Sequence, residues 1–171
     1  IASENRARMI DAAAARVTIS DADQNLLYHP HTSTSVTADQ ARSIADGNRE
    51  AVQLAIAAAN LQHSNWDIVY TTEAFGVPNL ADLGYLSKVL TFSARSNTDA
   101  GRADDAIADV RAGFSQSAAM MHEPLRVMLI NSIFFAYQHT DALKDVLNRS
   151  EPSATALASL ASTINESLVE S

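Results

Sequence analysis

The sequence contains no cysteine in its 171 residues. This absence excludes disulfide bonds, thiolate metal ligands and a cysteine nucleophile. It does not indicate a compartment, because cysteine-free chains suit both reducing and oxidising surroundings. Glycine and proline are also scarce, at 5 and 4 residues. Few turn residues and no concentration of β-branched residues argue against a protein built from short strands.

The chain also has few positively charged residues. The chain has 12 Lys and Arg against 20 Asp and Glu, so its formal net charge is −8. An acidic surface repels phosphate backbones, and no basic cluster reverses the sign locally. We therefore expect no nucleic-acid partner.

Long hydrophobic runs are missing as well. The longest strongly apolar stretch, 127–137, is about half of the ~20 residues that a membrane-spanning helix needs. We therefore expect no membrane insertion by this segment. The chain begins at Ile1 without a methionine, from which we expect a processed piece of a longer protein, with any targeting segment in the missing part.

Motifs that carry chemistry are also lacking. The sequence has no serine nucleophile elbow, phosphate-binding loop or dinucleotide fingerprint. We predict no enzymatic activity, no catalytic residues and no cofactor. An enzyme whose site has no recognisable motif is the alternative that this reasoning leaves open.

Alanine is what the sequence has in quantity, with runs at 12–15 and 57–59, and hydrophobic residues make up 47% of the chain. Alanine is the best helix former because it loses no side-chain entropy. We predict an all-α fold of about six helices, packed as antiparallel hairpins in one domain covering 1–171. The apolar periodicity places the helices at 4–17, 37–62, 79–101, 102–122, about 124–147, and from Pro152 onward.

Two segments interrupt this pattern: an irregular loop at about 19–36 and a connector at about 63–78. Ser3 and Asn79 are the expected caps of the helices that follow them, and Thr37 with Gln40 has the spacing of a capping box. Gly47 allows a kink or break inside the second helix. Trp66 and its apolar neighbours in the connector are expected to pack on the core.

The stretch 127–137 is apolar nearly all round. A helix without a polar face has to be covered on every side. We therefore predict that the other helices pack around it, with Ile130 and Phe134 at the centre of the core.

Histidines provide the sharpest candidate for a ligand site. In the irregular loop, His29 and His31 are separated by one proline and would hold a metal ion if His63, His122 or a carboxylate supplied a third ligand. The plainer interpretation is a polar loop with two exposed histidines, and we predict no metal site.

The other polar groups have simple structural explanations. His122 precedes Glu123, but Arg126 stands where a zinc-protease helix would need its second histidine, so His122 is expected at a helix end. His139 lies in a polar patch and is expected to be solvated or hydrogen-bonded. The acidic residues near the fourth helix are assigned to capping and solubility; they are Asp99, Asp104, Asp105 and Asp109.

Small residues at Ala94, Gly101 and Ala106 would let two antiparallel helices pack closely, and this stretch resembles the helical hairpin of tetratricopeptide repeats. A longer stretch, 86–147, resembles a helical region of uncharacterised secreted or membrane-anchored proteins of planctomycete-like bacteria. The features in common are Asp-Asp-Ala-Ile-x-Asp-Val, a short His-Glu-Pro link and Leu-x-x-x-Leu-Ile-x-x-x-Phe. The resemblance implies an extracytoplasmic, repeat-like helical domain and no catalytic residues.

These observations favour a non-enzymatic helical module that binds a protein or peptide partner, because stacked helix pairs expose a concave groove. The alternative is a small-ligand or metal-binding helical domain that uses the loop with His29 and His31.

Overall fold

The computed structural model describes residues 5–20, 23, 36–68, 78–121 and 125–169 of the chain. The described part contains seven helices and no strand, so the predicted all-α class is confirmed. The helices are α1 (Arg6–Ala14), α3 (Ala38–Gly47), α4 (Arg49–Ala58), α5 (Leu80–Asp99), α6 (Ala103–Met121), α7 (Arg126–Arg149) and α8 (Ala154–Val169).

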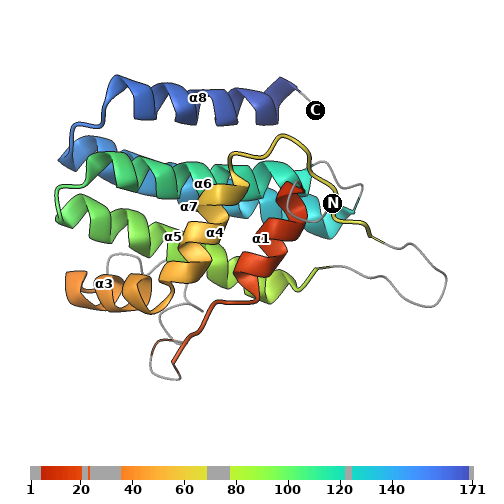
Figure 1. The fold of residues 1–171 in the computed structure, drawn as a ribbon, viewed down its shortest axis with the longest axis horizontal. Coiled ribbons are helices and arrows are strands. Elements are labelled where there is room, and N and C mark those ends of the chain that lie inside the picture. The colour runs from red at the N-terminus through yellow and green to blue at the C-terminus, as the bar shows by residue number, and fades with distance from the viewer. Residues whose placement is uncertain (1–4, 21–22, 24–35, 69–77, 122–124, 170–171) are drawn as a thin grey trace.

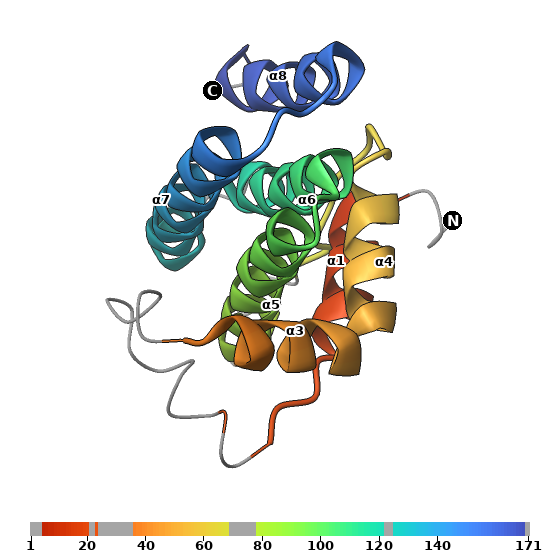
Figure 2. The same ribbon diagram turned by 90° about the vertical axis from the view of Figure 1, so that its left-hand side faces the viewer.

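The four longest helices, α5 to α8, run lengthwise in the molecule, and α1 and α4 lie across them (Figure 1). Both α1 and α4 pack against α5 and α6, whereas α3 packs mainly on α5 and α8 mainly on α6. Seen end-on, α5 and α6 stand between the α1–α4 pair on one side and α7 on the other (Figure 2). This arrangement leaves α7 at the edge of the bundle.

Helix boundaries follow the capping residues closely. Thr37 and Gln40 form the predicted capping box, in which the Thr37 Oγ1 accepts from the Gln40 N–H and the Gln40 Oε1 accepts from the Thr37 N–H. The Asn79 side chain caps α5 as predicted. The cap of α1 is Asn5, and Ser3 lies outside the described residues. The predicted helix 37–62 is broken at Asn48 into α3 and α4, at the place where Gly47 allowed a break.

The described part of the connector after α4, residues 63–68, packs on the bundle through Trp66, as expected. The Trp66 indole N–H donates to the Ala119 carbonyl in α6 at 2.8 Å. Arg6 ties the same region to α1, since its Nε donates to the Leu61 carbonyl and its backbone N–H to that of His63. None of the helices in the described ranges is long and apolar enough to cross a membrane.

The helices α5 and α6 form the predicted close hairpin. Gly101 adopts a positive φ of 73° just beyond α5, and two reversed hydrogen bonds close the turn: Arg102 N–H to Asn97 O, and Gly101 N–H to Thr98 O. This is the Schellman pattern, which favours glycine because a left-handed residue without a Cβ is unstrained. Beyond the turn, Ala94 and Ala106 are both buried in one cluster with residues from α7 and α8.

We predict that Ala106→Leu destabilises the fold, because Ala106 is fully buried where α5 and α6 approach. Overpacking of a core site costs ~1–3 kcal/mol. Ala103→Leu is the matched control: Ala103 is half-exposed in the first turn of α6, and leucine and alanine differ little in helix propensity. Urea melts should separate the two variants, and equal, negligible effects would show that the hairpin is not closely packed here.

The prediction for the stretch 127–137 is wrong in both of its parts, because the other described helices do not surround α7, which packs mainly on α5 and α6. Ile130 and Phe134 are exposed and do not lie at the centre of the core. The side of α7 that faces α5 and α6 carries Met128, Ser132, Phe135 and His139 instead, all of which are buried. The physical reason is the position of α7 at the bundle edge, where none of the other helices in the described part of the chain covers its outer side (Figure 2).

Candidate functional site

The outer side of α7 presents large apolar side chains over its first three turns, which we call the α7 apolar face. Tyr137, Ile130 and Ile133 are 65%, 66% and 59% exposed, and the other three members are each 41% exposed. The members of the face are Val127, Leu129, Ile130, Ile133, Phe134 and Tyr137. Contiguous exposed apolar patches of this kind mark interaction sites more often than chance exposure.

Helix geometry explains why these side chains share a side. Successive residues advance by about 100° around the axis, so Ile130, Phe134 and Tyr137 lie within about 60° of one another. Met128, Phe135 and His139 fall on the opposite side, where they meet α5 and α6. Ile130, Phe134 and Tyr137 therefore point away from the bundle, while Val127, Ile133 and Leu129 lie beside them at about 60° to 100° from Ile130 around the axis.

Charges flank this face at its two ends. Arg126 is exposed at the first residue of α7, and Asp141 is exposed one turn beyond Tyr137. Both lie within about 40° of Ile130 around the helix axis, so they extend the same stripe. Asp141 also accepts a hydrogen bond from the Lys144 ammonium at 3.0 Å, across an exposed surface.

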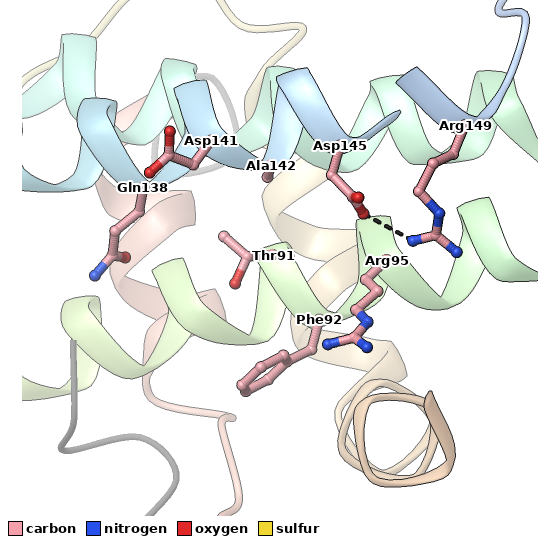
Figure 3. A pocket seen from close by; sticks show the side chains of 8 residues that line it. All are labelled: Thr91, Phe92, Arg95, Gln138, Asp141, Ala142, Asp145 and Arg149. Carbon is pink, nitrogen blue, oxygen red and sulfur yellow. Dashed lines mark hydrogen bonds and ion pairs between the residues drawn. The ribbon is translucent and has the colours of Figure 1, made fainter. Parts of the chain in front are cut away.

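A groove of about 470 Å³ lies beside the C-terminal half of α7, where it faces α5 (Figure 3). Six of its eight lining residues are polar or charged, although apolar atoms make up the larger part of its surface. The lining residues are Thr91, Phe92, Arg95, Gln138, Asp141, Ala142, Asp145 and Arg149. Arg149 bonds the Asp145 carboxylate at 2.9 Å and also pairs with Asp99. With six polar or charged lining residues, it differs from the apolar concave groove expected for peptide binding, and its Asp145 and Arg149 are paired with each other.

A buried polar group sits behind the α7 apolar face. The His139 ring is fully buried, and its Nε2 lies 3.0 Å from the Ser87 hydroxyl. Burial lowers the pKa of His139 from 6.5 to about 3, so the ring is neutral. The ring stands over Gly113 of α6, where a Cβ would lie 2.2 Å from its Cε1. The prediction of a hydrogen-bonded histidine is confirmed, and a solvated one is excluded. The Ser87 hydroxyl also donates to the Gln138 side chain at 3.0 Å.

Asp109 is the second buried ionisable group. It is 1% exposed, and burial raises the pKa of its carboxyl from 3.8 to about 7. Hydrogen bonds from Ser93 and Asn97 oppose this rise, the latter at 2.8 Å. The sequence-based assignment to solubility is therefore wrong for Asp109. Asp104 and Asp105 do occupy the first turn of α6, as expected, and Asp99 pairs with Arg149.

The structure describes only one of the four histidines that were considered as metal ligands. His29, His31 and His122 lie outside the described residues, so the loop hypothesis stays a prediction. His63 is described and its side chain is exposed. Among the residues that the structure describes, no group of three or more His, Asp or Glu side chains could hold a metal ion.

Sequence reasoning noticed the apolar residues of α7 but assigned them to the core. One signal in the sequence could have found the face. Apolar residues recur at three- and four-residue steps along the line 127–130–134–137, and a second line on the opposite side, 128–132–135–139, alternates apolar residues with Ser132 and His139. Only one of these lines can face a single bundle.

Comparisons with known proteins found no matching family model, no similar curated protein and no similar solved structure. The resemblance of 86–147 to bacterial extracytoplasmic proteins therefore stays a prediction, and the function has to be argued from the face itself.

Proposed function

We propose that this protein is a non-enzymatic interaction domain that binds an apolar helix of a protein partner on the α7 apolar face. One observation carries the proposal: six large apolar side chains are exposed together on the side of α7 that points away from the bundle. Removing apolar surface from water contributes about 25 cal/mol per Å², so covering this face favours association.

A helical partner suits the shape of the face better than an extended one. The exposed members are spaced along α7 at three- and four-residue steps, which matches the ridges of an approaching helix. Recognition of an extended peptide by strand addition would require an unpaired sheet edge, and the described residues contain no strand. The proposed binding mode is therefore helix against helix.

The repeat-like character of the hairpin belongs to the same proposal. The close α5–α6 pair with its glycine turn supports a tetratricopeptide-like unit, although the proposed binding face lies on the following helix. The extracytoplasmic location and the lack of a nucleic-acid partner stay predictions from the sequence. The alternative, a ligand site at His29 and His31, has no observation of the described residues in its favour.

A methyl NMR titration tests the proposal. The probe is a synthetic amphipathic helix with leucine and isoleucine on one face. We expect the methyl signals of Val127, Ile130 and Ile133 to shift, because these side chains are exposed on the face. The signals of Ile10 and Ile107, which are buried elsewhere in the bundle, serve as internal controls.

The same titration with Ile130→Ser should show much weaker shifts at the remaining face residues. Because Ile130 is exposed, this change should leave the melting temperature within a degree or two of the parent. Shifts confined to the groove beside Ala142, or an unaltered response in Ile130→Ser, would refute the proposal.

A further inference from the structure

We infer that the helix bound by the α7 apolar face is α7 of a second copy of this chain, in an antiparallel two-fold pair. This inference rests on the proposed interaction role of the face and adds the identity of the partner. It is carried by the charges at the two ends of the face and by the symmetry that they permit.

The apolar residues place the centre of such a pair. The most exposed members, Ile130 and Tyr137, lie at equal distances on either side of the midpoint between Ile133 and Phe134. When two copies of α7 cross antiparallel at this midpoint, Ile130 faces Tyr137 of the second copy, and Ile133 faces its Phe134. A two-fold interface is self-complementary in this way, since each contact occurs twice.

The charges at the ends of the face then distinguish an antiparallel from a parallel pair of α7 helices. With the same centre, Arg126 of one copy falls opposite Asp141 of the other, because both are equally far from the midpoint. Both side chains are exposed and lie on the same stripe as the apolar residues. A parallel pair in register would instead place Arg126 against Arg126 and Asp141 against Asp141. Like charges facing each other disfavour that arrangement, and opposite charges fix the antiparallel register.

The size of the face predicts how strong the pair is. Six large apolar side chains at these exposures form a patch on the order of 500 Å², at the upper end of what ordinary monomers expose. Two such patches together reach about 1,000 Å², near the lower limit for specific interfaces. We therefore expect a weak, reversible dimer.

Sedimentation velocity of the full chain tests this inference, at concentrations from about 1 to 500 µM. The parent should shift from monomer to dimer as concentration rises. Arg126→Asp and Asp141→Arg should each weaken the dimer about tenfold or more, since each places like charges at both ends of the interface. The double variant should recover most of the parent affinity, because it restores the pairs with their signs exchanged.

A matched control distinguishes a specific pair between Arg126 and Asp141 from a general effect of net charge on dimerisation. Arg42→Asp makes the same change of charge on α3, away from the α7 apolar face, and should leave the dimer unchanged. Recovery in the double variant, together with an unaffected Arg42→Asp, supports the inference. The inference is overturned if the double variant dimerises as weakly as the single variants. It is also overturned if Arg42→Asp weakens the dimer as much as they do.

The two proposals can fail separately. A parent chain that stays monomeric at all concentrations overturns the self-pairing, while a methyl response to the synthetic helix at Ile130 and Ile133 would still support the interaction role. Absence of both results would refute both proposals.

Discussion

Replacing Gly113 by alanine is expected to lower the free energy of unfolding by at least about 2 kcal/mol, although alanine is the better helix former. A Cβ at position 113 would lie 2.2 Å from Cε1 of His139 and 2.3 Å from both ring nitrogens. The ring cannot move aside easily, because it is fully buried and its Nε2 is held by the Ser87 hydroxyl. Either α6 and α7 separate or the Ser87 hydrogen bond is lost, and both outcomes destabilise the bundle.

Gly84→Ala is the control for this prediction. Gly84 is also in a long helix, but a Cβ there would meet only the Phe135 ring at 3.9 Å, an ordinary van der Waals distance. Removing a helical glycine in open space should stabilise by up to about 1 kcal/mol. Chemical denaturation should therefore show changes of opposite sign for the two variants. If Gly113→Ala does not lower the free energy of unfolding, α6 and α7 are not as close as the structure places them.

The second large effect concerns pH. Asp109 has a pKa raised by burial to about 7 in the folded protein, against an ordinary 3.8 when the chain is unfolded. Between these values the unfolded chain loses its proton first, so this group lowers stability as pH rises from about 4 to 7. Asp109→Asn removes the ionisation and keeps an oxygen that can accept from the Asn97 amide. The variant should gain stability over the parent with rising pH, by up to a few kcal/mol at pH 8.

His139 acts in the opposite direction over much of the same range. Burial lowers its pKa to about 3, while the unfolded chain takes up a proton below 6.5, so this group lowers stability as pH falls from 6.5. In the parent, the pH dependences of stability that come from Asp109 and His139 partly cancel. Urea melts of Asp109→Asn and the parent from pH 4 to 8 isolate the Asp109 contribution as their difference. A difference that does not change with pH would show that Asp109 ionises freely in the folded state.

Local signals in the sequence located most of the helices well. The capping box at Thr37, the Asn79 cap and the glycine turn at Gly101 depend on neighbouring residues alone, and the structure contains all three. Such features are predictable because their hydrogen bonds close within a few residues. The same reasoning found the hairpin that buries Ala94 and Ala106.

The orientation of α7 could not be found in this way. Its core side includes Ser132 and His139, whereas its outer side includes Ile130 and Phe134, so polarity alone indicates the reverse of the observed orientation. Which side faces inward depends on a partner from elsewhere in the chain: Ser87 of α5 supplies the hydrogen bond that makes a buried His139 tolerable. Long-range pairing of this kind leaves no local pattern. Burial of Asp109 beside Asn97 was missed for the same reason.

Single-cysteine crosslinking can show whether the α7 apolar face is a protein interface, because the chain has no cysteine of its own. In the antiparallel pair, position 134 lies next to its own copy at the centre. Position 127 is displaced from its copy by about 20 Å along the axis, beyond the roughly 7 Å between Cα atoms that a disulfide spans. Leu157→Cys, an exposed site on α8, measures random collision.

We expect Phe134→Cys to form a covalent dimer rapidly under mild oxidation, while Val127→Cys and Leu157→Cys crosslink slowly and at similar rates. Rapid crosslinking of Val127→Cys would contradict the antiparallel register. Phe134→Cys crosslinking no faster than Leu157→Cys would contradict the interface formed by two copies of α7.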